Sequence, residues 1–296
     1  MTTHNTLGYY AEPGPLTTAG LGGTALAALP STVPDLLEAV QGLLVHEPGS
    51  AESATGHLRA TLQILDRILA AGPRPLTEPR PAAQRLPGCC RHFALVTVAA
   101  LRAKGIPARA RCGFGRYFVP GWHGDHWAVE YWNAATSRWI LADAQLSPEL
   151  CEALGIAFNP AEVPRDEFVV AGDAWIRCRE GNLDPSRCGI EGEGRSGWWW
   201  VAGNLVRDVA ALSKMELLPW DVWGCMPGPD DPIPDILAEE FDQVAAVTAD
   251  PDTAADSRAR YGNERFRVPA HVYNFLRRAN ESVIETARPQ SFTADA

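Results

Sequence analysis

The stretch from residue 90 to residue 142 constrains the fold most, because it has the pattern of one buried helix followed by three strands. Apolar residues recur at helical spacing from Cys90 to Lys104, and Gly105 follows as a stop signal. Three strands are then predicted, with a turn at 133–137 before the last, at Ala108–Phe118, His126–Trp132 and Arg138–Ala142. The sequence therefore predicts an α+β core in which a helix packs on a small sheet.

Three residues of this unit have the side chains that acyl-transfer chemistry needs. Cys90 stands where a glycine-containing loop meets the helix, and the unpaired N–H groups of a helix N-terminus favour a thiolate there. His126 begins the second strand, and Asp143 ends the third. A thiol nucleophile needs a base beside it, and the base needs a carboxylate that fixes its tautomer. We therefore predict a catalytic triad of Cys90, His126 and Asp143.

Each member of this triad has a rival close by in the sequence. Cys89 lies one residue before the helix, about 100° away around it, so only one of the two thiols can face the base. Asp125 is the alternative carboxylate, but as the neighbour of His126 it projects to the opposite face of the strand. His123 and His126 lack the i, i+4 helical spacing of a metal pair. We expect neither a metal nor a cofactor.

At this point the pattern resembles the transglutaminase-like superfamily of cysteine enzymes, and the resemblance spans residues 85–146. The matching positions, in order, are Gly88-x-Cys90, Ala94, Gly105-Ile106-Pro107-Ala108-Arg109, His126-Trp127 with Glu130, and Trp139 with Asp143. The family commonly has His-x-Trp, whereas Trp127 directly follows His126 here. The resemblance implies a papain-like α+β core, with the helix that bears the cysteine packed on an antiparallel sheet and the triad at their junction.

The rest of the chain is predicted to add large helical extensions to this core. Residues 1–75 are expected to form an N-terminal arm (1–33) followed by helices over 34–44 and 56–71, and 76–150 to form the catalytic core. Residues 151–296 are expected to be a mainly helical extension that shapes the pocket, in one compact unit with the core. The helices predicted beyond the core are 147–154, 166–180, 198–213, 235–248 and 269–287.

Further residues are candidates for binding the substrate or its oxyanion. Gln84 precedes Cys90 by six residues, which is the spacing of the donor glutamine in papain-like enzymes, and the N–H of Cys90 is a second donor. Six tryptophans fall within residues 175–223, a pattern that fits either packing or a pocket for a polar metabolite. The remaining substrate-binding candidates are Arg116, Tyr117, Trp127, Glu130, Trp175, Arg177, Trp220 and Asp221.

Composition excludes several classes of protein. A formal net charge of −10 argues against a nucleic-acid-binding protein, which would show a basic face. No apolar run approaches the length of a spanning helix, and the polar N-terminus lacks the pattern of a signal peptide. Seven scattered cysteines do not form a disulfide pattern. We expect a cytoplasmic protein with a small-molecule or peptide substrate and no nucleic-acid or membrane partner; the oligomeric state stays open.

These observations predict a cysteine-nucleophile enzyme that cleaves or transfers an acyl group of a small amide or thioester through a thioester intermediate. Hydrolysis is favoured over transfer. An amide-forming acyltransferase of small-molecule biosynthesis is the first alternative, and a catalytically inactive binding module on the same fold is the second. Fold alone does not decide among the three.

Overall fold

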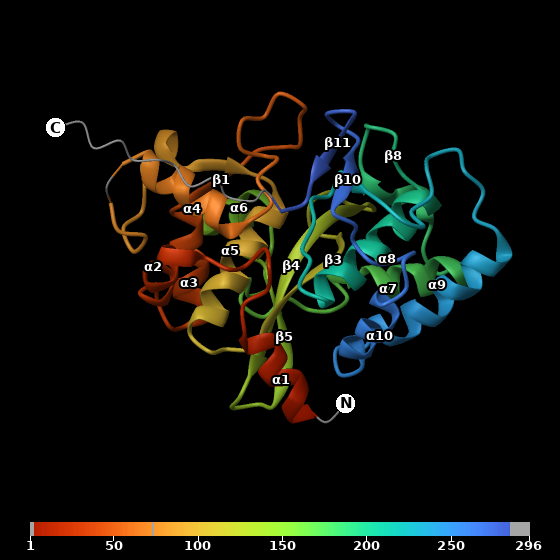
Figure 1. Ribbon diagram of the computed structural model, residues 1–296, viewed down its shortest axis with the longest axis horizontal. Coiled ribbons are helices and arrows are strands. Elements are labelled where there is room, and N and C mark those ends of the chain that lie inside the picture. The colour runs from red at the N-terminus through yellow and green to blue at the C-terminus, as the bar shows by residue number, and fades with distance from the viewer. Residues whose placement is uncertain (1–2, 73, 285–296) are drawn as a thin grey trace.

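A six-stranded sheet lies at the centre of the computed structural model, which describes residues 3–72 and 74–284 (Figure 1). Its strands are β3 (Ala108–Gly115), β4 (His123–Asn133), β5 (Arg138–Ala142), β6 (Phe168–Val170), β7 (Cys188–Ile190) and β8 (Arg195–Ser196). The order is β6-β3-β4-β7-β8, and β5 also pairs with β4. Every pairing is antiparallel except that of β4 with β7. The predicted α+β fold class is confirmed.

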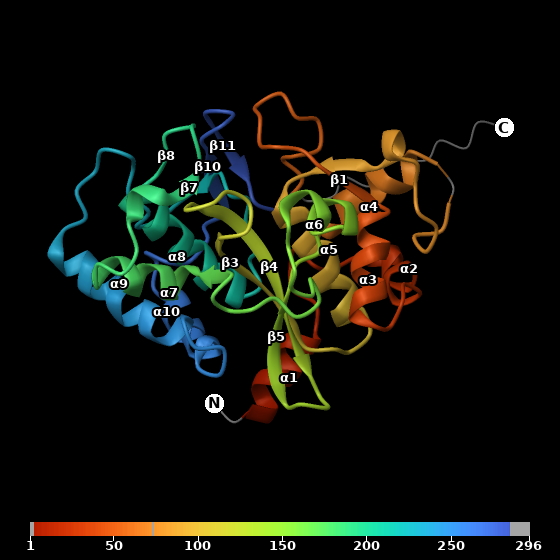
Figure 2. The ribbon, with the colours of Figure 1, turned by 180° about the vertical axis from the view of Figure 1, so that it is seen from behind.

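The helix α5 (Cys90–Ala103) packs against this sheet as the sequence predicts. All of its residues from Cys90 to Arg102 are buried, so the helix has no solvent-exposed face over this range and depends on packing against its surroundings for stability. Gly105 ends it with φ of +71°, a left-handed conformation that a glycine adopts without a steric cost. Figures 1 and 2 show α5 beside β4, near the middle of the molecule.

The predicted turn between the second and third core strands is also confirmed. Asn133 accepts hydrogen bonds from the N–H groups of Ala135 and Thr136 through its side-chain oxygen, and Ser137 adopts φ of +51°. An asparagine that caps a turn in this way fixes the register of the two strands it joins. In that register Val129 of β4 lies opposite Ala142 of β5. Asp143, the next residue after Ala142, therefore lies close to the part of β4 that contains His126.

The N-terminal part is helical and packed, so the prediction of an arm over residues 1–33 is wrong for the residues that are described. Tyr10 and Leu16 are fully buried, and the Tyr10 hydroxyl donates to the carbonyl of Leu212, 202 residues away. Such long-range contacts leave no local sequence signal. The elements before α5 are α1 (Thr3–Ala11), η1 (Gly20–Gly22), α2 (Gly23–Ala27), α3 (Val33–Gln41), β1 (Leu44–His46), α4 (Thr61–Ala70), η2 (Ala82–Gln84) and β2 (Leu86–Gly88).

The C-terminal part is mainly helical, with one clear departure from the prediction. Residues 271–282 form a β-hairpin in place of the helix predicted over 269–287, and the end of that range, 285–287, lies outside the described residues. The helix predicted over 166–180 starts later, because 168–170 pair with β3. The elements are α6 (Pro148–Leu154), α7 (Ala171–Arg179), η3 (Pro185–Arg187), α8 (Trp198–Leu212), β9 (Asp221–Val222), α9 (Asp235–Thr248), η4 (Ala254–Ser257), α10 (Arg258–Tyr261), β10 (His271–Asn274) and β11 (Ala279–Ser282).

Figures 1 and 2 place the two additions on opposite sides of the sheet. The helices α2, α3 and α4 flank α5 on one side, and α7, α8, α9 and α10 lie on the other. None of the described helices is long and apolar enough to cross a membrane.

A buried ion network joins the C-terminal helices to the sheet. Arg111 of β3 bonds Asp208 of α8 at 3.0 and 2.9 Å, and it also bonds Glu130 of β4 at 2.9 Å. Glu130 accepts further bonds from Arg109 and Arg165, and Arg109 also contacts the face of the Trp139 ring. Because all these groups except Arg165 are buried, removing one partner would leave an uncompensated charge. The network therefore fixes the strand that carries His126.

Candidate active site

His126, the fourth residue of β4, contacts Asp143, the residue that follows β5. The Nε2 atom of His126 lies 2.7 Å from Oδ2 of Asp143. The second carboxylate oxygen, Oδ1, accepts the N–H of Gln145 at 2.9 Å, and the N–H of Asp143 donates to the carbonyl of Pro160. Because Asp143 comes directly after β5, the pairing of β5 with β4 brings the carboxylate to the imidazole.

Tyr117 completes the set of donors to this carboxylate. Its hydroxyl donates to Asp143 Oδ2 at 2.7 Å, the same oxygen that contacts His126. Burial raises the pKa of Tyr117 well above its usual range, so the hydroxyl stays a donor. Burial also opposes ionisation of Asp143, but its contacts with His126, Tyr117 and Gln145 outweigh that effect and lower the pKa of Asp143. The carboxylate therefore stays charged beside the imidazole.

Aromatic rings surround the imidazole and restrict its orientation. The ring centroid of His126 lies 4.8 Å from that of Phe118, 6.0 Å from Tyr117 and 6.1 Å from Phe168, each in an edge-on arrangement. Only 2% of the His126 surface is exposed. Since Nε2 is held by Asp143, Nδ1 is the nitrogen left for a thiol, and it forms no hydrogen bond with any residue that the structure describes.

Cys90 is the first residue of α5, the helix that packs against the strand of His126. Among the smaller influences on the pKa of Cys90, the charge of Asp125 raises it and the N–H of Trp127 lowers it. The charge of Cys90 acts on the pKa of Tyr117, but no hydrogen bond joins the Cys90 sulfur to His126 among the residues that the structure describes. Gly88 allows this approach of loop and helix, since a Cβ there would lie 3.0 Å from the side chain of His92.

Cys89 precedes the helix as its N-cap and has a different environment. Its Sγ atom lies 3.3 Å from Nδ1 of His92, and the side chain packs against Leu218 and Trp220. Burial opposes its ionisation, but a hydrogen bond from Cys90 and the ring of His92 outweigh it and hold the pKa of Cys89 well below its ordinary value.

The hydrogen bond between Cys90 and Cys89 sets the resting protonation of the two thiols. The hydrogen bond to Cys89 and burial raise the pKa of Cys90 well above its ordinary value. Cys90 is therefore the protonated thiol of the pair.

His46 belongs to this site and was not predicted from the sequence. It pairs with Gly88 in the parallel β1–β2 ladder, and its exposed side chain is within electrostatic reach of Cys89, His126 and Asp143. Desolvation by the surrounding protein lowers the pKa of His46, which favours the neutral ring. The pairing joins segments 42 residues apart, so no local pattern could have indicated it.

Several candidate residues lie elsewhere. Glu130 forms ion pairs with three arginines, and Asp221 bonds Arg59 at 2.9 and 2.6 Å. The prediction that these two carboxylates bind substrate is therefore corrected, because both have structural roles. Gln84 is exposed in η2 and has no hydrogen bond to the triad within the described ranges. The other candidates have these contacts: Arg116 bonds the Asp166 carbonyl, Trp127 is buried in the core, Trp175 bonds Asp242, Arg177 bonds Asp173, and Trp220 bonds His57.

A comparison with known protein families matches the sequence of the core. The model of the transglutaminase-like superfamily matches residues 62–144, which include Cys90, His126 and Asp143. The chain carries a transglutaminase-like core. This core indicates a cysteine-based enzyme in general terms, without fixing the substrate or the reaction.

Two further comparisons give little beyond this core. A solved structure described as a putative cysteine protease from Cytophaga hutchinsonii is similar at 18% identity and a TM-score of 0.35, over 56% of this chain and 48% of that protein. The chain thus spans about half the length of that protein. Comparison with curated proteins gave no match.

Proposed function

We propose that this transglutaminase-like protein is a cysteine enzyme that uses Cys90 as nucleophile, His126 as base and Asp143 as the residue that orients the base. The observation that carries the proposal is the 2.7 Å contact of His126 Nε2 with Asp143, which leaves Nδ1 for the thiol beside the same strand. The carboxylate fixes the tautomer and stabilises the imidazolium once the proton has moved.

The reaction then follows from the positions of these groups. His126 Nδ1 takes the proton of Cys90, and the sulfur attacks the acyl carbon of an amide or thioester. The tetrahedral intermediate collapses to a thioester, and His126 returns the proton to the departing amine or thiol. Water, activated by the same imidazole, attacks the thioester and releases the acid and the free thiol.

The backbone N–H of Cys90 is the donor we assign to the oxyanion. As the first residue of α5 it has no acceptor within the helix, and the positive end of the helix dipole lies at the same place. A developing negative charge on the acyl oxygen would be stabilised there by a preorganised donor.

We propose a small molecule or short peptide as the substrate, with hydrolysis favoured over transfer. The triad residues are nearly closed off, with 7% of Cys90 and 2% of His126 exposed, so an extended protein surface would not reach the sulfur readily. The acidic net charge also disfavours nucleic acid.

Turnover of p-nitrophenyl acetate tests the proposal without knowledge of the natural substrate. The ester should release nitrophenolate in a burst as Cys90 is acetylated, followed by slower hydrolysis of the thioester. Cys90→Ala should abolish the burst while the far-ultraviolet circular dichroism stays unchanged, and Cys89→Ala should retain it. Loss of the burst in Cys89→Ala alone would assign the nucleophile to the other thiol. Saturable acceleration of acyl-enzyme decay by an amine acceptor, with the acetyl amide as product, would favour transfer.

A further inference from the structure

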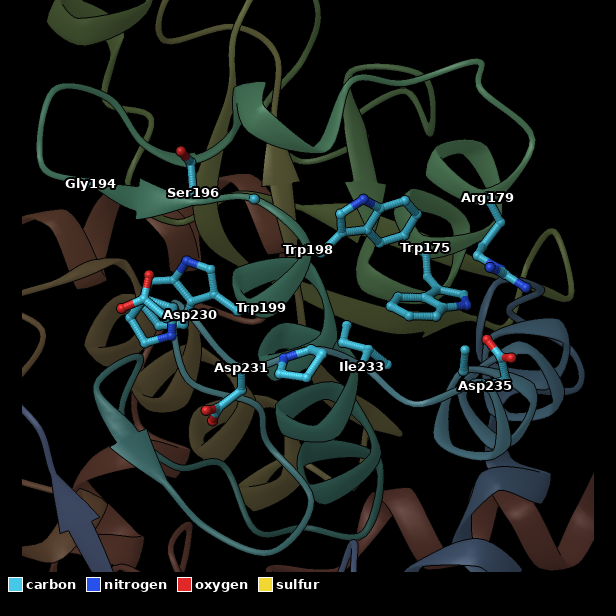
Figure 3. A pocket seen from close by; sticks show the side chains of 14 residues that line it. Trp175, Arg179, Gly194, Ser196, Trp198, Trp199, Asp230, Asp231, Ile233 and Asp235 are labelled. Atoms are coloured by element: carbon cyan, nitrogen blue, oxygen red, sulfur yellow. The ribbon is translucent and has the colours of Figure 1, made fainter.

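A cavity of about 720 Å³ lies in the C-terminal addition, apart from the triad (Figure 3). It is bounded by the starts of α8 and α9, by α7 and by residues 229–233, the loop that precedes α9. None of Cys90, His126 and Asp143 lines it. A volume in this range suits a small organic ligand.

Three indole rings form the apolar part of the lining. Trp175 and Trp198 lie side by side in Figure 3, with centroids 5.3 Å apart at 74°, and Trp199 lines the other end. Trp198 keeps 37% of its surface exposed, which is unusual for so large an apolar side chain. Trp198 and the half-buried Trp199 therefore present indole surface to the cavity, whereas Trp175 is buried, with 1% of its surface exposed.

The Trp175 ring is held in place from behind by Asp242. The indole N–H of Trp175 donates to Asp242 Oδ1 at 2.7 Å, and Arg179 bonds both oxygens of the same carboxylate at 3.1 Å each. Arg179 itself lines the cavity and its ion pair with Asp242 is exposed, so it places one positive charge against the three carboxylates of the lining. An indole fixed in this way loses little freedom when a ligand binds.

The remaining charges of the lining are negative. Asp230, Asp231 and Asp235 are exposed, and none forms an ion pair within the part of the chain that the structure describes. Figure 3 shows Asp230 near Trp199 and Asp235 on the side of Trp175 and Arg179. Aromatic faces and carboxylates together attract a positive charge, the rings through their quadrupole and the carboxylates through Coulomb attraction.

The wall that carries two of these carboxylates is stiff. Four prolines fall within the eight residues 227–234, and two of them, Pro229 and Pro232, line the cavity. Proline fixes φ, so the loop loses less conformational freedom on binding than an ordinary loop of the same length. The cavity is thus largely formed before any ligand arrives.

We propose that this cavity is a binding site for an organic cation with an alkylated ammonium group, separate from the triad. Neutral apolar ligands would gain only contact with the indoles, whereas a cation gains the ring quadrupoles and the carboxylates as well. The proposal does not depend on the proposed function, because binding is measured without turnover.

Calorimetric titration of the full chain with three probes of the same shape tests it. Choline is the cation, 3,3-dimethylbutan-1-ol is its neutral isostere, and 3,3-dimethylbutanoate is the anion. Choline should bind about tenfold more tightly than the alcohol, the scale of a few cation–aromatic contacts, and more weakly as salt is added. Equal binding of choline and the alcohol, preference for the anion, or no saturable binding of choline would each overturn the proposal.

Two sets of variants locate the binding. Trp198→Leu should reduce the preference for choline over the alcohol, because leucine keeps apolar bulk without a ring face while the carboxylates remain. Asp230→Asn with Asp235→Asn should weaken choline and leave the alcohol unchanged. The matched control, Asp66→Asn with Asp256→Asn, removes the same charge at exposed positions outside the lining. If the control weakens choline as much as the cavity variant does, the attraction is general and the site assignment is wrong.

Discussion

Replacing Asp143 with asparagine is the most informative single change, because the structure shows what each carboxylate oxygen does. Oδ2 faces two donors, His126 and Tyr117, while Oδ1 accepts the N–H of Gln145. An amide has only one oxygen. If that oxygen faces His126, the NH₂ group meets the N–H of Gln145; if it faces Gln145, the NH₂ group meets the imidazole and forces the proton onto Nδ1.

The cost of each arrangement, in free energy or in rate, can be estimated. Two donors facing each other in a buried site cost about 1–3 kcal/mol. The second arrangement avoids that clash but leaves an Nδ1 that cannot accept the thiol proton, and the wrong tautomer reduces catalysis by roughly 10⁴-fold in the best-studied triad. In Asp143→Asn we therefore expect the burst of nitrophenolate release from p-nitrophenyl acetate to be slower by about two to four orders of magnitude. Stopped-flow absorbance would measure its rate.

Asp125→Asn is the matched control for this experiment. Asp125 adjoins His126 in the chain, and its Oδ1 atom accepts from Trp200 and Asn204, bonds that an asparagine oxygen retains. Since the charge of Asp125 raises the pKa of Cys90, we expect this variant to acylate no more slowly than the unmodified protein. A burst in Asp143→Asn as fast as in the control, with both proteins folded, would refute the role of Asp143.

Three further predictions follow from the same contacts. Cys89→Ser removes the main cause of the raised pKa of Cys90, so iodoacetamide labelling of Cys90, mapped by peptide mass, should begin at lower pH; an unchanged profile would contradict the coupling of the thiols. Tyr117→Phe removes one bond to Asp143 and should slow acylation about tenfold, with the acid limb of the pH–rate profile moved upward as the pKa of Asp143 rises. Glu130→Gln should lower the free energy of urea unfolding by about 3–5 kcal/mol at neutral pH, because arginines lose their buried partner. Burial opposes the ionisation of Glu130, but the charge of the arginines outweighs it and lowers the pKa of Glu130 in the folded protein. The stability that this carboxylate contributes is therefore lost as the pH falls below about 4.3, the pKa of an unperturbed glutamate. The difference in unfolding free energy between variant and unmodified protein should narrow there, and a constant difference would contradict this.

Local pattern was sufficient for the core of the fold. The apolar spacing from Cys90 and the stop at Gly105 give α5 almost to the residue, and β5 begins and ends where the alternation predicts. His126 and Asp143 follow from the same register, since a strand, a short turn and a second strand determine which residues meet. These features depend on neighbours in the sequence.

Features that depend on distant contacts were missed. Nothing local shows that Tyr10 is buried against the end of α8, or that His46 pairs beside Gly88. The hairpin over 271–282 did carry a signal, the alternation of exposed His271 and Tyr273 with buried Val272, which the helical interpretation overlooked. The tryptophan cluster divides in the structure, because some indoles pack in the core and others line a cavity away from the triad.

The central claim, that Cys90 is the nucleophile and His126 its base, is tested most directly by locating the acyl group. The protein would be quenched in acid during the burst with p-nitrophenyl acetate, and the peptide that contains both cysteines would be fragmented by mass spectrometry. Cys89→Ser and Cys90→Ser would be treated alike, so that transfer of the acyl group between neighbouring thiols is recognised. We predict acetyl on Cys90 in the unmodified protein and in Cys89→Ser, and none in Cys90→Ser or His126→Ala. Acetyl on Cys89 in Cys90→Ser at the unmodified rate, or full acetylation of His126→Ala, would contradict the account.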